Sequence, residues 1–158
     1  MRKPKIYLET TMFNFYLDAD RDAHADTVKL FREVKEGKYE AYTSRAVIEE
    51  IEKTLGDKKE KMLGIIAEYD LPVLDTSVEA ENLADVYVAE GVIPIKYRTD
   101  GLHIAISAVN DLDMIISMNF QHIVKRKTVK MTAVINSLRG YRAVEIYSPM
   151  EVVSNEDF

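Results

Sequence analysis

Four polar residues from distant parts of the chain are of the types that bind divalent cations. Glu9 ends a short apolar run, Glu50 lies in an amphipathic stretch, and Asp100 precedes a strongly apolar one. Asn119 follows the apolar run 114–116. Carboxylates that are brought together repel one another unless a cation or a proton offsets their charge. Mg²⁺ or Mn²⁺ held by a few carboxylates and water is a common solution, and it supports phosphodiester hydrolysis.

Each of these residues also has an ordinary structural explanation. Glu9 could accept hydrogen bonds from the backbone amides of the turn that follows it. Asp100 could be a helix N-cap, and Asn119 could cap a turn before Phe120. The metal-site hypothesis therefore depends on whether the fold brings the four side chains together.

The elements that must position these residues alternate along the chain. Apolar runs typical of strands are separated by stretches with helical periodicity. The expected strands span 5–8, 39–43, 71–74, 113–117 and 142–147, and the expected helices span 12–17, 22–36, 45–55, 57–68, 76–90, 100–109 and 128–138. This alternation predicts an α/β domain in which a mainly parallel sheet lies between helical layers. Ligands of such folds bind beyond the carboxyl ends of the strands.

Helical periodicity separates the two adjacent glutamates of the stretch 45–55. Val47, Ile51 and Leu55 would form its buried stripe. Glu50 borders that stripe beside Val47, whereas Glu49 lies nearly opposite and should face solvent. Glu50 is therefore the better candidate for a residue that points into the molecule.

The histidines and the standard nucleotide-binding motifs favour no other chemistry. His24, His103 and His122 lack the close spacing of a zinc site. His103 comes one turn after Asp100 and could line the same site, although such a histidine is more often a packed core residue. No GxGxxG, GxxxxGK[ST] or GxSxG sequence occurs, which argues against dinucleotide binding, P-loop phosphoryl transfer and serine hydrolysis.

Length and composition predict one cytoplasmic domain. The 158 residues suit a single domain over 1–153, followed by a short acidic tail over 154–158. No apolar run is long enough to cross a membrane, and the chain has no cysteine. Because the net charge is −6, contact with a nucleic acid must be local. The basic residues Lys125, Arg126, Lys127 and Lys130 could guide an RNA backbone, or they could be a solvated helix start.

Four segments of the chain together resemble the motifs of the PIN-domain family, and in particular its VapC-like toxin ribonucleases. The segments are 6–13 (IYLETTMF), 44–51 (SRAVIEEI), 100–105 (DGLHIA) and 116–123 (ISMNFQHI). The last of them is similar to a branch of the family that has asparagine at the fourth acidic position, here Asn119. The ending at 140–149 also resembles that branch, so the likeness spans nearly the whole chain.

This resemblance implies a three-layer α/β/α sandwich with a Mg²⁺ or Mn²⁺ site. It also implies an endoribonuclease, the toxin of a type II toxin–antitoxin pair, with RNA as substrate, a cognate antitoxin and a homodimeric state. Glu9, Glu50 and Asp100 would then hold the metal, with Asn119 assisting. Thr10 and Thr11 could contact a phosphate or the shell around the metal.

Three positions depart from the family pattern, and two of them, Glu9 and Asn119, support a second hypothesis. Glu9 stands where aspartate is usual, Asn119 where many active members have aspartate, and Gly101 where alanine is usual. A PIN-fold module that binds RNA or a protein without cleaving is therefore the alternative. A receiver-like domain is a third hypothesis, but it would need an aspartate that ends a central strand and a lysine after a later strand.

Overall fold

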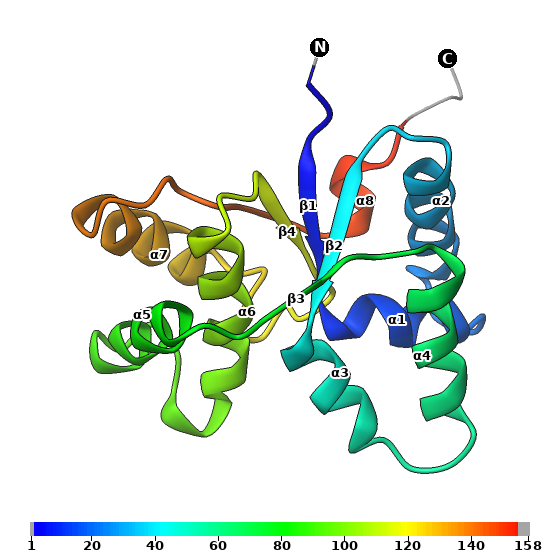
Figure 1. Cartoon of the computed structure of the whole chain (residues 1–158), viewed down its shortest axis with the longest axis horizontal. Coiled ribbons are helices and arrows are strands. Elements are labelled where there is room, and N and C mark those ends of the chain that lie inside the picture. The colour runs from blue at the N-terminus through cyan, green and yellow to red at the C-terminus, as the bar shows by residue number, and fades with distance from the viewer. Residues whose placement is uncertain (1, 155–158) are drawn as a thin grey trace.

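The computed structural model describes residues 2–154, in which five parallel strands form one central sheet (Figure 1). The strand order is β3-β2-β1-β4-β5, and every neighbouring pair is parallel. The strands are β1 (Lys5–Leu8), β2 (Glu40–Ser44), β3 (Val73–Leu74), β4 (Met114–Ile116) and β5 (Glu145–Tyr147).

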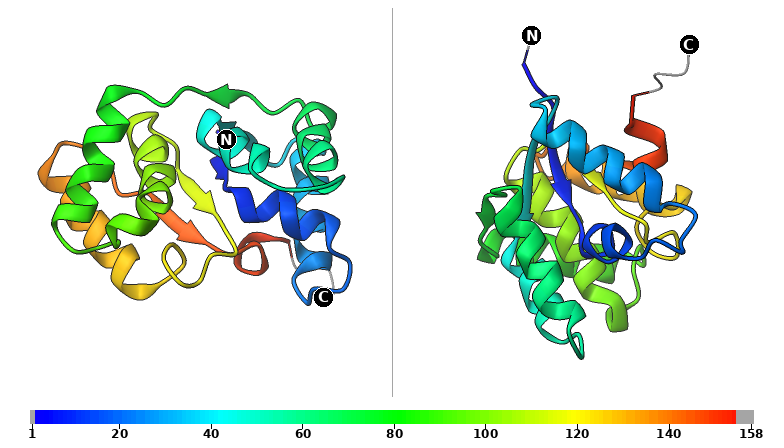
Figure 2. Two further views of the ribbon diagram at one scale, coloured as in Figure 1. Left: turned by 90° about the horizontal axis from the view of Figure 1, so that it is seen from below. Right: turned by 90° about the vertical axis from the view of Figure 1, so that its right-hand side faces the viewer.

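Helices cover the sheet from both sides. In Figure 1, α5, α6 and α7 lie on the left of the strands, and α1, α2, α4 and α8 lie on the right. The left view in Figure 2 shows the same separation into two helical groups. The helices are α1 (Thr10–Leu17), α2 (His24–Lys35), α3 (Arg45–Glu52), α4 (Lys58–Glu68), α5 (Val78–Ala89), the 3₁₀ turn η1 (Ile95–Tyr97), α6 (Arg98–Val109), α7 (Arg126–Leu138) and α8 (Pro149–Val152). The predicted three-layer α/β/α class is confirmed.

The central strand β1 explains why the core forms where it does. Ile6, Tyr7 and Leu8 are completely buried, and so are Ile115 and Ile116 of the neighbouring β4. Side chains of successive strand residues point to opposite faces, so both faces of the sheet are covered. Buried polar backbone is satisfied by the parallel ladder, in which Leu8 pairs with Ile116.

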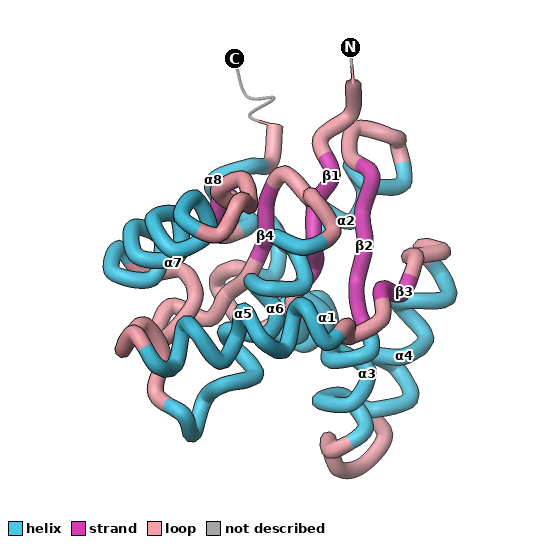
Figure 3. The backbone as a smooth tube through the Cα atoms, turned by 60° about the vertical axis from the view of Figure 1, so that its left-hand side comes forward, coloured by secondary structure: helices cyan, strands magenta, loops and turns pink. Residues whose placement is uncertain are grey.

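The strand order creates a switch point between β1 and β4. From β1 the chain passes to β2 and β3 on one side of the sheet, and then crosses to β4 and β5 on the other side. A crevice forms at the carboxyl ends of two strands whose connections leave in opposite directions, and ligands bind there. These ends lie at the bottom of the sheet in Figure 1, close to the starts of α1 and α3, and Figure 3 shows the same arrangement from another side.

The structure corrects several details of the sequence analysis. Helix α3 ends at Glu52, so Leu55 does not belong to its buried stripe and its side chain is 90% exposed. Neither η1 nor α8 was expected. Ser154, which we assigned to the acidic tail, donates hydrogen bonds to the buried Glu33 through its backbone N–H and its hydroxyl. The other tail residues, 155–158, lie outside the described residues.

One further finding concerns membranes. Within residues 2–154, none of the helices combines the length and the apolar character that a membrane span requires.

Candidate metal centre

The four candidate residues line one hollow of about 340 Å³ at the switch point. Glu9 follows β1 and caps α1, Glu50 comes from α3, Asp100 lies in the first turn of α6, and Asn119 follows β4. The hollow is also lined by Thr10, Thr11, Asn14, Thr54, Lys58 and Met62. The fold therefore brings together side chains that are up to 110 residues apart in sequence.

Glu9 is held rigidly through one of its two carboxylate oxygens. Its Oε1 accepts a hydrogen bond from the Thr11 hydroxyl at 2.6 Å, from the Thr11 backbone N–H at 3.2 Å and from the Ser117 hydroxyl at 2.6 Å. The other oxygen, Oε2, has no hydrogen-bond partner among residues 2–154. Only 2% of Glu9 is exposed. Its Oε1 caps α1, as the ordinary explanation predicts, and its Oε2 is left for the functional one.

Glu50 ends a hydrogen-bond chain that runs through the core. Its Oε1 accepts from the Thr10 hydroxyl at 2.6 Å and lies 2.5 Å from Nε2 of His103. Nδ1 of His103 lies 2.6 Å from the Tyr7 hydroxyl, which in turn lies 2.7 Å from the Ser44 hydroxyl. When His103 is neutral, Ser44 can donate to Tyr7, Tyr7 to His103 and His103 to Glu50. When His103 is protonated, it donates to both Glu50 and Tyr7, and Tyr7 donates to Ser44.

This hydrogen-bond chain also sets the protonation states of its residues. Burial raises the pKa of Glu50, but the hydrogen bond from His103, its charge and the Thr10 hydroxyl together hold the pKa below its ordinary value. Burial lowers the pKa of His103, but the neighbouring carboxylates, Glu50 first, raise it above its ordinary value. Burial raises the pKa of Tyr7 well above 10, so this hydroxyl keeps its proton. Glu50 is therefore an anchored carboxylate at neutral pH.

Asp100 is the carboxyl group that ionises with most difficulty. Burial is the main reason why its pKa rises to about 6; His103 opposes the rise, and the negative charges of Glu9 and Glu50 add to it. The Asn119 side chain favours the charged form of Asp100. Asp100 lies inside the first turn of α6, whereas the cap position is Tyr97, so the expectation that Asp100 caps this helix is wrong.

Asn119 uses its oxygen within the protein. Oδ1 accepts a hydrogen bond from the His122 backbone N–H at 3.0 Å, as a turn cap does. The amide nitrogen is thereby left to favour the charged form of Asp100. This arrangement fits a residue that positions Asp100 better than one that binds a metal directly.

The substrate-binding candidates fall into two groups. Thr10 and Thr11 line the hollow, but each hydroxyl already donates to a carboxylate, to Glu50 and Glu9 respectively. Lys125, Arg126 and Lys127 are exposed at the start of α7 and are not among the residues that line the hollow.

The residues present fit a divalent cation bound by oxygen. Three carboxylates and one lysine, Lys58, line the hollow, and each of the two glutamates raises the pKa of Asp100 by its charge. Ligand atoms of Glu9, Glu50 and His103 lie within 4.8 Å of one another. Both His103 nitrogens are engaged by Tyr7 and Glu50, so we assign it the positioning of Glu50 and assign coordination to the carboxylates. Mg²⁺ and Mn²⁺ prefer such oxygen ligands.

Gly101 is explained by packing. A Cβ atom at this position would lie 3.2 Å from Cδ1 of Ile93 and 3.5 Å from the Tyr87 ring. Because Gly101 has no side chain, α6 can pack closely against Ile93 and Tyr87 at the position next to Asp100.

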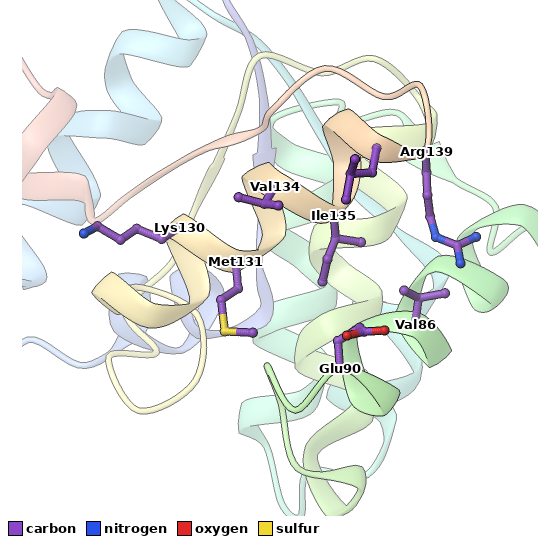
Figure 4. Close-up of a pocket in the computed structure, with 8 residues that line it drawn as sticks. Val86, Glu90, Lys130, Met131, Val134, Ile135 and Arg139 are labelled. Carbon is purple, nitrogen blue, oxygen red and sulfur yellow. The ribbon is translucent and has the colours of Figure 1, made fainter.

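A larger hollow lies elsewhere among the described residues. It measures about 790 Å³ and lies between α5 and α7 (Figure 4). In Figure 4, Val86 of α5 and Glu90, the C-cap of α5, face Met131 and Ile135 of α7. The lining of this hollow is mainly apolar and holds a single carboxylate, so it lacks the group of carboxylates that lines the smaller hollow at the strand ends.

Sequence reasoning missed three residues that organise the centre. They are Tyr7, Ser44 and Ser117, which hold His103 and Glu9 through side-chain hydrogen bonds. All three are buried and lie in or directly after a strand, so nothing in their residue types sets them apart from ordinary core residues. The position of Ser117 two residues before Asn119 is a usable signal, because both follow the strand that neighbours β1.

Comparisons with known proteins agree with this geometry at the level of the fold. No protein-family model matches the sequence, and no curated protein matches it. Among solved structures, VapC20 of Mycobacterium tuberculosis, a Sarcin-Ricin loop cleaving toxin, superposes with a TM-score of 0.59 at 13% identity, over 89% of this chain and 98% of that one. VapBC2 of Rickettsia felis, bound to a DNA fragment from its promoter, gives a TM-score of 0.54 at 12% identity, over 91% and 98%. The chain has the fold of the VapC toxins.

The VapC fold explains why the centre lies where it does. The resemblance stated from four short motifs predicted this fold, and the match over about nine tenths of both chains confirms it. Within this fold the five parallel strands direct Glu9 and Asn119 to one edge, while α3 and α6 bring Glu50 and Asp100 to it.

Proposed function

We propose that this chain is a divalent-metal-dependent endoribonuclease that acts in the cytoplasm as the toxin of a type II toxin–antitoxin pair. The observation that carries the proposal is the pair of anchored glutamates, Glu9 and Glu50, each with Oε1 saturated and Oε2 without a partner among the described residues, beside Asp100. The VapC fold supports it, since one neighbour with this fold is described as a Sarcin-Ricin loop cleaving toxin.

The side chains have separate tasks in this proposal. Glu9, Glu50 and Asp100 would hold Mg²⁺ or Mn²⁺, which when bound activates a water molecule and offsets charge on the attacked phosphate. His103 keeps Glu50 oriented and ionised. Ser117 fixes the rotamer of Glu9, and Asn119 favours the ionised form of Asp100.

Calorimetric titration with Mn²⁺ tests the metal centre directly. We expect one binding event per chain, and we expect binding at pH 6 to release about half a proton per site, because the pKa of Asp100 is about 6 and its carboxyl group is half protonated at that pH. The released proton makes the measured heat depend on the ionisation enthalpy of the buffer. RNA cleavage should require Mn²⁺ or Mg²⁺ and stop in EDTA. Absence of any Mn²⁺ binding, or cleavage that persists in EDTA, would contradict the proposal.

The second candidate is a module with the same fold that binds RNA or a protein without cleaving. The observation that favours it is the engagement of the Asn119 oxygen by the His122 N–H, which leaves three carboxylates for the metal. This candidate predicts RNA binding that is equal with and without divalent metal, and intact RNA after prolonged incubation with Mn²⁺.

We also propose a cognate antitoxin and a homodimer as partners. The surface that supports a protein contact is the apolar groove between α5 and α7, where Val134 is 60% and Leu138 is 82% exposed. Apolar patches of this kind commonly mark protein interfaces.

A charge placed in the groove should separate the homodimer. We expect Leu138→Asp to elute as a monomer by size-exclusion chromatography with light scattering, because an interface does not bury an unpaired carboxylate. Leu55→Asp is the matched control, because Leu55 is 90% exposed and does not line the groove. A wild type that is monomeric at micromolar concentration, or a Leu138→Asp variant that stays dimeric, would exclude this groove as the dimer interface.

A further inference from the structure

An exposed tyrosine is stacked on a histidine beside the metal centre. The rings of Tyr97 and His122 lie 4.2 Å apart between centroids, with an angle of 29° between their planes. Tyr97 is 37% exposed, so much of the tyrosine remains open to solvent. The exposed Lys96 reaches over the Tyr97 ring only loosely, with its Nζ 5.7 Å from the centroid.

Both residues of the stack are connected to residues of the metal centre. Tyr97 is the N-cap residue of α6, and Asp100 lies in the first turn of the same helix, so the two are three residues, or about 4.5 Å along the helix axis, apart. The His122 backbone N–H donates to Asn119, which lines the hollow. A polymer bound across the carboxylates would therefore contact the Tyr97 and His122 rings next.

His122 has features that packing alone does not explain. Its Nε2 is buried and has no hydrogen-bond partner in the part of the chain that the structure describes, which costs stability. Burial and the nearby Lys125 lower its pKa, so the ring stays neutral near pH 7 and offers an uncharged face for stacking. The Thr128 hydroxyl donates to the His122 carbonyl at 2.8 Å and thereby holds the start of α7 against this residue.

Three basic residues follow His122 closely in sequence, at the start of α7. Lys125, Arg126 and Lys127 occupy the cap and first turn of α7, which contains no acidic residue. Cations are disfavoured there by the helix dipole, so their positions are not explained by helix stability. Lys125 and Lys127, together with His122, line a hollow of about 400 Å³.

We propose that Tyr97 and His122 form a base-stacking subsite for single-stranded RNA, in which Lys125, Arg126 and Lys127 contact the adjacent phosphates. The proposal rests on the proposed ribonuclease function, and it specifies where a nucleotide next to the scissile phosphate would bind. Aromatic rings and a basic surface are the combination with which proteins bind unpaired nucleotides, whatever their sequence. The net charge of −6 requires such a local surface.

The chain itself offers a specific reporter, because it contains no tryptophan. In a Tyr97→Trp variant, all tryptophan emission comes from the subsite. We expect the emission to fall by more than half when a 12-nucleotide single-stranded RNA is added in EDTA. Tyr141→Trp is the matched control, because Tyr141 follows the far end of α7, and we expect its emission to stay unchanged.

Binding of the same fluorescein-labelled RNA, measured by anisotropy in EDTA, gives the energetic test. We expect Tyr97→Leu to weaken binding about tenfold, since stacking of one base has an effect of this order. Tyr97→Phe keeps the ring and should bind within about twofold of the wild type. Tyr141→Leu is the control for loss of a tyrosine elsewhere, and thermal melting confirms that each variant is folded.

The outcomes separate this subsite from the ribonuclease function. Unchanged affinity in a folded Tyr97→Leu variant, or unchanged Tyr97→Trp emission with saturating RNA, would overturn the subsite even if the wild type cleaves RNA with Mn²⁺. Binding that depends on Tyr97 without any metal-dependent cleavage would support the subsite and overturn the nuclease.

Discussion

Replacing Asp100 with asparagine is expected to lower the rate of Mn²⁺-dependent RNA cleavage by at least about 100-fold, the scale set by loss of an electrostatic group at a reaction centre. The substitution keeps the shape of the side chain and its place in the first turn of α6, but removes the charge that a divalent cation needs. Mn²⁺ affinity should fall together with cleavage. Retained cleavage in this variant would show that the reaction occurs elsewhere.

The same substitution should make the protein more stable near neutral pH. The pKa of Asp100 is about 6 in the folded state and about 3.9 in an unfolded chain. The folded state therefore binds the proton more tightly, and the stability of the wild type falls as the pH rises from about 4 to above 6. Two pKa units correspond to about 3 kcal/mol, and partial exposure reduces the expected gain to about 1 kcal/mol at pH 7.5.

Thermal melting at two pH values measures this effect. A gain of about 1 kcal/mol raises Tm by about 2–4 °C for a domain of this size. The Asp100→Asn variant should melt higher than the wild type at pH 7.5, and the difference should vanish near pH 4, where the wild-type carboxyl group is also neutral. Saturating Mn²⁺ should raise the Tm of the wild type alone. A variant that is less stable than the wild type at pH 7.5 would show that Asp100 is not destabilised by its surroundings.

The adjacent glutamates of α3 provide the second experiment. Glu50→Gln is expected to reduce cleavage by at least about 100-fold, whereas Glu49→Gln should change it by less than about twofold. The two variants remove the same charge from neighbouring positions of one helix, but Glu49 is exposed and Glu50 lines the hollow with its carboxylate held by Thr10 and His103.

Stability should respond to Glu50→Gln in the opposite direction from Asp100→Asn. The pKa of Glu50 is lowered on folding, so its charge contributes stability above about pH 4.3 that is lost as the pH falls. The pKa of His103 is raised, so its proton contributes stability that is lost as the pH rises above about 6.5. Between these limits the pair is mutually stabilising, and Glu50→Gln should lower Tm at pH 5.5.

Equal losses of cleavage in Glu49→Gln and Glu50→Gln would indicate a general effect of charge on RNA binding. Loss in neither variant would remove α3 from the metal centre. Because Glu49→Gln has the same composition as Glu50→Gln, it also controls for expression and for the change of net charge.

Local sequence patterns were sufficient for the class of fold and for the choice of Glu50. The alternation of apolar runs predicted five strands, and all five form. Element ends were less certain: α3 stops at Glu52, and Leu55 is exposed. Where a helix or strand ends depends on the neighbouring elements that it must cover, and the periodicity of the sequence carries no information about these neighbours.

The sequence by itself determined the elements, the parallel sheet and the residue types that could meet at its carboxyl edge. The tertiary structure alone decided how they meet. His103 is a buried core residue that also holds Glu50, and Ser117, which follows β4, aligns Glu9 from more than 100 residues away in sequence. Hydrogen-bond partners and the pKa of about 6 at Asp100 depend on distances and burial in three dimensions. Spacing along the chain encodes which face a side chain occupies, but packing between elements sets what it contacts.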